Sequence, residues 1–486
     1  MISTRHTMFV YGLDQPNHQK HNLKKIKKDL CQKTFYMKKM NNKKEKTKSF
    51  NIEFETGLTK KDRDLCEKKL RIGRSMYNAF LGEALKRYSN FSRDPRMTKL
   101  RELYQPPKAR KKELKAKIKA AEKKKPVDKK AIKIMKEELR EIQTELNEYG
   151  AAMNQVKKEY GWFGKYSLAD MRKEQSHHFK GAIGSSIAST LSQRAFRAVE
   201  RMEIDPATDT VNFVKKDKDF SIEGNTNDNG IIYKNGLIYF DIRKDQYVTI
   251  KPARKKDEEY YNEALQNRVK YCRLLSRVIR GRKRYYVQVI LEGTPPDKRK
   301  YGTGKIEILD VKISHAEMKK KNGKTEIVEL APGCRNPEEK IAELDRRMDA
   351  SRRASNPGNY NENGTIKEGA NNWVYSNNYR KLAARRKELY RSMKVRRKIA
   401  HEELVNRILA EGTDITIRHL SYKEQQQRSK KETEINPNTG RPYSKARQGK
   451  NIGNRAPSEF LSILSRKLSY IDKTVEDQSK EQKEGK

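Results

Sequence analysis

Clusters of lysine and arginine are the side chains in this sequence whose spacing most directly indicates a chemistry. The segment VIRGRKR contains Arg280, Arg282, Lys283 and Arg284. The basic stretch within residues 376–411 contains Arg385, Arg386, Arg396 and Arg397. Guanidinium and ammonium groups bind phosphate oxygens and release condensed counterions, so both clusters predict contacts with a nucleic-acid backbone.

The composition of the whole chain agrees with this interpretation. The 486 residues include 111 Lys and Arg against 64 Asp and Glu, a formal charge of +47. Nucleic acid is the leading partner for such a charge, but a ribosomal-type structural protein, an acidic membrane surface and plain solvated charge stay open on composition alone. With 34% hydrophobic residues the chain is not a disordered tail, and its length predicts several domains.

Other chemistries have weak signals. The four cysteines are far apart and form no CxxC pair, and His177, His178, His315 and His419 show no spacing typical of metal ligands. We therefore expect reduced, structural thiols and no cofactor. No apolar run is long enough to span a membrane and no signal peptide precedes the chain, so we expect an intracellular protein with no membrane partner.

The elements that must position these residues follow from periodicity. Residues 1–48 predict a basic arm, and Phe50, Ile52 and Phe54 alternate as in a strand. Helices are expected from Thr59, over 109–149 with a break at Pro126, and over 186–203. The segment IIYKNGLIYF is typical of a hairpin with a turn at Asn235-Gly236, and further strands are expected at 247–250, 269–275 and 285–291.

A second pattern begins after residue 304. KIEILDVKIS predicts a buried strand, TEIVEL its neighbour after an Asn322-Gly323 turn, and two helices at 337–353 and 376–411 flank a loop rich in Asn and Gly. DITIRHL follows as a strand. Strand, hairpin, helices and strand together indicate part of an α/β domain.

Several motifs in combination resemble one family. They are YNAFLGEALKR (77–87), QRAFRAVERM (193–202), VKYCRLLSRVIRGRKRYYVQVILEGTP (269–295), LAPGCRNPEEKIAELDRRMDASRRASNPGNYNENGTIKEG (330–369) and IGNRAPSEFLSILSRKL (452–468). From about residue 50 to 472 the chain resembles TnpB, the RNA-guided DNA endonucleases of insertion sequences, related to the type V CRISPR effectors. The resemblance implies a guide noncoding RNA of the omega type as partner, which pairs with double-stranded target DNA beside a short motif. More narrowly than the sequence itself, it implies a location in the prokaryotic cytosol, associated with the nucleoid.

The resemblance also implies an α+β multidomain fold. The expected parts are the arm at 1–48, the first strand of a wedge-type antiparallel β-barrel at 49–58, a helical recognition insertion at 59–203, the rest of the barrel at 204–300, an incomplete RuvC-like (RNase H-type) α/β domain at 301–472 and a charged tail at 473–486. In this arrangement Tyr77 and Asn78, on the first helix, join the candidates for nucleic-acid contact.

The carboxylates of the family's nuclease site are mostly missing. RuvC-type cleavage uses two metal ions held by several carboxylates. Asp310 stands at the position of the first, in ILDVK, but Lys312 replaces a glycine of the family's GIDIG pattern. Arg418 occupies the position of the second, a glutamate, and cannot bind a cation. The third aspartate and a zinc ribbon normally follow the NRAP segment and are expected to be absent here.

These departures favour a nuclease-dead, RNA-guided DNA-binding protein of TnpB descent, which could repress transcription by blocking polymerase. In that reading Asp310 is a residual, inactive carboxylate and no metal is bound; Mg²⁺ would be required only if nuclease activity survives. Asp414, four residues before Arg418, could share its strand face as a replacement carboxylate, but we expect it simply to start the strand. A working endonuclease, active or cut short in its record, and a decayed transposon fragment are the alternatives.

Overall fold

The computed structural model describes residues 47–123, 128–204, 210–216, 218–241, 246–297, 300–319, 323–333, 337–419, 421–422 and 449–478. Residues 49–486 form one unit, separate from 1–48. The predicted basic arm therefore lies outside the described residues except for Thr47 and Lys48, as does Asn322 of the second predicted turn. None of the helices within these described ranges is long and apolar enough to cross a membrane.

The first half of the chain is largely helical. After strand β1 (Ser49–Thr56) come five helices: α2 (Lys60–Ser92), α3 (Pro95–Lys123), α4 (Lys129–Glu159), α5 (Ala169–His178) and α6 (Ser185–Ile204). Thr59 is the N-cap of α2, as predicted, because its hydroxyl accepts a hydrogen bond of 3.1 Å from the backbone N–H of Asp62. Helices α2 and α6 pack against each other and against the strand that follows them.

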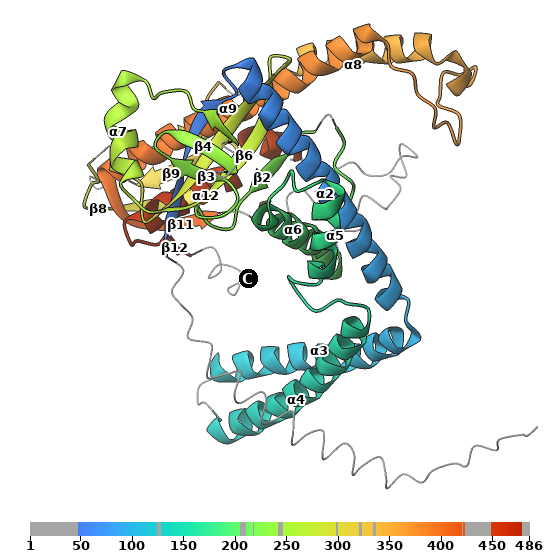
Figure 1. The fold of residues 1–486 in the computed structure, drawn as a ribbon. Coiled ribbons are helices and arrows are strands. Elements are labelled where there is room, and N and C mark those ends of the chain that lie inside the picture. The colour runs from blue at the N-terminus through green and yellow to red at the C-terminus, as the bar shows by residue number, and fades with distance from the viewer. Residues whose placement is uncertain are drawn as a thin grey trace, which may run out of the picture. The chain divides into compact units, whose positions relative to one another are not determined.

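Helices α3 and α4 form a helical hairpin with a small core of its own (Figure 1). That core consists of Leu114, Ile118, Ile142 and Leu146. The predicted break near Pro126 separates the two helices, although residues 124–127 themselves are not described. The sequence did not predict that α3 continues through Pro106 and Pro107, two residues that cannot donate backbone hydrogen bonds.

The first sheet contains four strands in the order β1-β7-β6-β2, with β6 (Val269–Ile279), β7 (Arg282–Glu292) and β2 (Ser221–Glu223), and all its pairs are antiparallel. The predicted wedge-type barrel is wrong, because closure requires continuous pairing around the strands. Here β1 and β2 are edges. An isolated bridge between Thr56 and Ile250 connects β1 to the segment after the next sheet, and the Thr56 hydroxyl donates a hydrogen bond of 2.6 Å to the carbonyl of Thr249.

A second, three-stranded sheet contains β3 (Ile232–Lys234), β4 (Leu237–Asp241) and β5 (Gln246–Thr249), followed by α7 (Lys255–Leu265). The predicted hairpin turn is confirmed. Lys234 pairs with Leu237, and both turn residues have positive φ, 50° for Asn235 and 74° for Gly236, as a type I′ turn requires.

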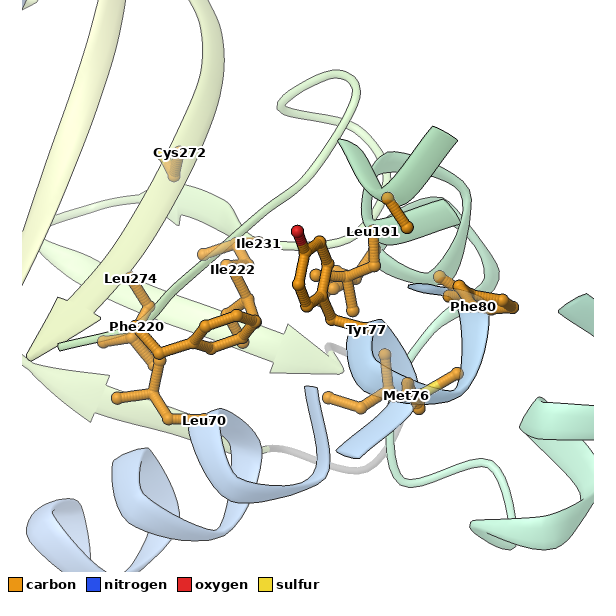
Figure 2. Packing of buried hydrophobic residues seen from close by; sticks show 14 of the residues in the cluster. Leu70, Met76, Tyr77, Phe80, Leu191, Phe220, Ile222, Ile231, Cys272 and Leu274 are labelled. Carbon is orange, nitrogen blue, oxygen red and sulfur yellow. The ribbon is translucent and has the colours of Figure 1, made fainter. Parts of the chain in front are cut away.

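One core joins these sheets to α2 and α6. Leu70, Met76, Tyr77 and Phe80 of α2 meet Leu191 of α6 and Phe220, Ile222, Ile231, Cys272 and Leu274 of the β-rich part (Figure 2). Cys66 and Cys272 are free and buried, and burial raises the pKa of each thiol to about 12, so the predicted structural role is confirmed for these two.

The second half contains a five-stranded sheet in the order β10-β9-β8-β11-β12. Its strands are β8 (Gly304–Val311), β9 (His315–Lys319), β10 (Thr325–Glu329), β11 (Gly412–His419) and β12 (Glu476–Asp477). The first three are antiparallel, whereas β11 is parallel to both β8 and β12. The sheet is open and mixed, so the whole chain has an α+β fold.

Helices join the strands of this sheet. They are α8 (Glu338–Ser355), the 3₁₀ turn η2 (Pro357–Asn359), α9 (Asn377–Glu411), α11 (Gly449–Arg455) and α12 (Pro457–Tyr470). Leu404, Val405 and Ile408 of α9 and Phe460 and Leu464 of α12 pack on the sheet. The segment predicted as a charged tail begins differently: Glu476 and Asp477 pair with β11, and 479–486 lie outside the described residues.

Candidate nucleic-acid interface

Asp310 lies near the end of the central strand β8, and its cross-strand neighbour on β9 is Glu317. Burial raises the pKa of its carboxyl group, and the charge of Glu317 raises it further, while the positive charges of Lys312 and of His315 oppose that rise. The ammonium group of Lys312 forms an ion pair of 2.5 Å with Glu317. Two of the charges nearest Asp310 therefore neutralise each other without a metal ion.

Arg418 does not face Asp310. Its guanidinium donates a hydrogen bond of 3.3 Å to the side-chain oxygen of Gln478, beyond strand β12. The charge of the next residue, His419, adds to those that oppose the rise in the pKa of Asp310, and its ring stacks on Tyr422 with ring centroids 5.9 Å apart. A bulge between Ile417 and His419 changes the register there, which the sequence pattern does not reveal.

Asp414 is too far from Asp310 for the two carboxylates to bind the same metal ion. It pairs with Lys305 at the other end of β8, five residues from Asp310, which corresponds to about 16 Å along a strand. Within the described ranges, no group of three or more His, Cys, Asp or Glu side chains could hold a metal ion. Asp414 is therefore too far from Asp310 to replace the missing carboxylate.

Tyr77 and Asn78 serve the packing of α2. Tyr77 is 7% exposed, and its ring lies between Phe220 and Leu191 (Figure 2), with a centroid distance of 5.9 Å to Phe220. Asn78 donates to and accepts from the backbone of Val214, at 3.0 and 2.9 Å. A contact between either side chain and nucleic acid stays a prediction, but both have structural partners.

The basic turn of VIRGRKR is shorter than predicted. Only Arg280 and Gly281 form the turn, with φ of 50° and 73°, and the other three cations lie on β7. Lys283 forms an ion pair with Glu67 at 2.6 Å and Arg284 one with Glu55 at 3.0 Å. Arg282 is exposed, and among the described residues it has no carboxylate partner.

The four arginines chosen on α9 form two pairs: Arg385 and Arg396 share one side of the helix, and Arg386 and Arg397 share another. Arg386 is paired with Asp345, and Arg397 with Glu459 at 3.0 Å. Arg385 lies beside Arg280 in a cavity of about 710 Å³ with a floor of Leu344 and Leu389, so the structure brings these two predicted residues together. Arg396 is exposed on the same side of the helix as Arg385, eleven residues away.

A larger cleft lies on the opposite side of α9. It has a volume of about 1350 Å³ and is enclosed by one face of the first sheet, α9 and α12. We call it the basic cleft; its cationic side chains are Arg194, Arg273, Arg277, Lys387, Arg391, Lys394, Lys398, Arg466 and Lys467. Its four carboxylates are Glu53, Asp219, Glu402 and Glu403, so basic groups outnumber acidic ones by nine to four.

One wall of the basic cleft is a stripe on α9. Lys387, Arg391, Lys394 and Lys398 recur at intervals of three or four residues, which places them on a single helical face. Arg391 is held by Glu388, at 2.6 Å, and hydrogen bonds from Arg391 lower the pKa of that glutamate to about 2. The three lysines are exposed and, among the described residues, have no carboxylate partner.

The floor is a hydrogen-bonded network on the first sheet. Arg277 reaches Glu53 at 2.7 Å, Gln288 donates to the same carboxylate at 2.9 Å, and Arg273 donates to Glu223 at 2.6 Å. Burial alone would raise the pKa of Glu53, but these hydrogen bonds and the charges of Arg277 and Lys398 hold it below its usual value. Arg273 and Arg277 on the floor are therefore paired with carboxylates, whereas the three lysines of the wall form no ion pair among the described residues.

Sequence reasoning missed the cleft because the four arginines that it selected on α9 do not line it. The available signal was the spacing of Lys387, Arg391, Lys394 and Lys398, which are interleaved with the residues that were chosen. A helix with cations on all sides does not disclose which side faces a neighbouring sheet.

Comparisons with known proteins are limited to weak structural similarity. No protein-family model matches this chain, and no curated protein matches it. A protein in the cryo-EM structure of a Cas12f1-sgRNA-target DNA complex aligns at 11% identity with a TM-score of 0.32, covering 89% of each chain. A CRISPR-Cas12f ternary complex aligns at 13% identity and a TM-score of 0.21, covering 64% of this chain and 63% of that one. At these scores neither similarity establishes a common fold.

Proposed function

We propose that this protein binds nucleic acid in the basic cleft. The observation that carries the proposal is the row of exposed lysines on α9, which faces a sheet whose own charges are already paired. Lys387 and Lys398 are eleven residues apart, or about 16 Å along the helix. That distance corresponds to about five phosphates of one strand at 3.4 Å each, so the stripe has the length needed to follow a backbone.

We further propose that the ligand is a guide RNA together with the DNA strand that pairs with it. The sequence motifs that resemble TnpB support this mode, in which base pairing supplies sequence specificity and the protein supplies a cationic surface for the duplex backbone. The cleft suits that division of labour, because its wall offers ammonium groups, which attract phosphates, rather than a set of groups that would read bases.

The third part of the proposal is that the protein occupies its target without cutting it. Two-metal hydrolysis requires several carboxylates around a pair of cations. The carboxylate opposite Asp310, Glu317, is instead paired with Lys312, and Asp414 lies opposite the other end of β8. A protein that holds DNA without cleaving it would block polymerase, so repression of transcription is the proposed consequence.

Sequencing the RNA that copurifies with the full chain tests the guide. We expect one defined small RNA with a constant scaffold and a guide segment, and a matching duplex DNA should then bind more tightly than a scrambled one. Heterogeneous cellular RNA with no common sequence would contradict RNA guidance and would leave only non-specific attraction by the positive charge.

A further inference from the structure

A small pocket opens next to the basic cleft. It has a volume of about 240 Å³ and is formed by the linker after β7, the C-terminal part of α9, and α7 and α12. Tyr260, Pro295, Lys467 and Tyr470 line both the pocket and the cleft, so the two spaces are continuous. We call it the tyrosine pocket, after Tyr260, Tyr301 and Tyr470.

The lining combines flat apolar surfaces with a few polar groups. Three tyrosine rings and the rings of Pro295 and Pro296 form its sides, and Leu409 and Ala410 contribute apolar surface. Such surfaces accept the face of an aromatic ligand, and polar groups at the edge then fix its orientation. A volume of 240 Å³ is below the ~300 Å³ at which pockets for drug-sized ligands begin, which excludes a duplex and suits a single base.

The polar groups of the pocket are Lys300, Asn406, Lys467 and the carboxylate of Asp297, which accepts a hydrogen bond of 3.1 Å from the Tyr301 hydroxyl. The ammonium of Lys467 donates to the side-chain oxygen of Asn406 at 2.5 Å and pairs with Glu402 at 2.7 Å. The amide nitrogen of Asn406, which has no acceptor among the described residues, can donate to a base edge. Lys300 is exposed at the rim, in a position to meet a phosphate.

We propose that the tyrosine pocket holds one unpaired nucleobase that leaves the nucleic acid in the basic cleft. This inference rests on the proposed function. A base inserted there stacks on tyrosine while its phosphate stays with the cations of the cleft, so the pocket fixes the register of a strand without reading a long sequence. The chemistry is the same for a base from RNA or from DNA.

Photo-crosslinking identifies the source of the base. The ribonucleoprotein would be prepared in one arm with 4-thiouridine in the RNA and in the other with 4-thiothymidine in the target DNA, and cross-linked peptides would be mapped by mass spectrometry. We expect a cross-link to Tyr260, Tyr301 or Tyr470 in one arm. Cross-links confined to the α9 stripe in both arms would overturn the proposal.

Substitution of Tyr301 provides the second test. Tyr301 is 37% exposed, so Tyr301→Ala should fold, and Tyr375→Ala is a matched control because Tyr375 is 39% exposed and lies outside the pocket. Loss of one base-aromatic stack should weaken binding of a short single-stranded oligonucleotide about 5- to 150-fold. Tyr301→Phe should retain the affinity, since the ring remains. Equal affinities for Tyr301→Ala and Tyr375→Ala would refute the pocket.

The two proposals fail separately. If a defined RNA copurifies but Tyr301→Ala binds like the wild type, the pocket is wrong and the proposed function stands. If no defined RNA is found, binding of the short oligonucleotide to the RNA-free full chain still tests whether the pocket holds a base, because that measurement requires only a single strand.

Discussion

The charge of His419, on the neighbouring strand β11, opposes the rise in the pKa of the Asp310 carboxyl group. The guanidinium of the adjacent Arg418 instead donates a hydrogen bond to the side chain of Gln478. Alternate residues of a strand point to opposite faces, so this difference follows from the pleat and from the bulge beside Ile417. The residue that aligns with a family glutamate is thus not the residue of β11 whose charge acts on Asp310.

This relationship predicts that Arg418→Glu alone will not create a nuclease. The new carboxylate would lie on the Gln478 side, and Lys312 would remain beside Asp310. Incubation of the wild-type and variant ribonucleoproteins with a matched duplex and Mg²⁺ should give no specific scission. Cleavage by the wild type that disappears in Asp310→Ala would contradict the proposal, and cleavage that persists in Asp310→Ala would identify a contaminating nuclease.

Reversing charge on the α9 stripe should weaken nucleic-acid binding. Lys394→Glu combined with Lys398→Glu removes two exposed cations from the cleft wall. For duplex DNA the slope of log affinity against log salt should become shallower by about 1.8, at about 0.9 per phosphate contact. The measurement is a titration by fluorescence anisotropy at several salt concentrations.

The matched control lies on the other face of the same helix. Arg385→Glu combined with Arg396→Glu changes the net charge by the same amount but leaves the cleft intact. We expect a smaller loss of affinity and an almost unchanged slope. If both pairs behave alike, binding depends on total charge and the cleft is not the interface.

The sequence predicted those features of the fold that depend on local chemistry. Thr59 caps α2, and Asn235-Gly236 forms its turn, because each depends on a hydroxyl or a positive φ within a few residues. It failed where distant segments meet. The open edge of β1, the register that separates Asp414 from Asp310, and the cleft face of α9 all depend on which sheet a strand or helix packs against.

His401 should make stability depend on pH. Its side chain is fully buried on α9, and Nε2 donates 2.8 Å to the carbonyl of Arg455, while Nδ1 has no partner among the described residues. Burial lowers the pKa of His401, and the charge of Arg397 lowers it further, against the effects of that carbonyl and of Glu459. The unfolded state therefore binds the proton more readily. As far as His401 is concerned, the protein is most stable above the pKa that the imidazole has in the unfolded state, and it loses stability as pH falls below that value.

Urea unfolding at about pH 7.5 and about pH 5.5 measures this effect, whose slope cannot exceed about 1.4 kcal/mol per pH unit for one group. His401→Gln is the control, because its amide can still donate to the carbonyl of Arg455 but does not titrate. The wild type should lose more stability than the variant over this interval. Identical losses would show that other groups cause the pH dependence.

Arg455 should contribute more to stability than another ion-paired arginine nearby. Its guanidinium pairs with Glu329 at 2.5 Å and donates hydrogen bonds to the carbonyls of Leu330 and Ala331, at 3.0 and 2.8 Å. The side chains of Leu330 and Ala331 are fully buried. Arg455→Ala leaves these acceptors unsatisfied, so we expect a loss of about 2–4 kcal/mol in the free energy of unfolding.

The comparison is Arg466→Ala on the next helix. The Arg466 side chain is 45% exposed and its pair with Glu402 is open to solvent, so its removal should cost about 0–1 kcal/mol. Arg455→Lys should lie between the two, because an ammonium group keeps the charge but not the planar fork that reaches two carbonyls. Urea unfolding of the three variants measures the order, and equal losses for Arg455→Ala and Arg466→Ala would show that α11 is not anchored to the end of β10 through this side chain.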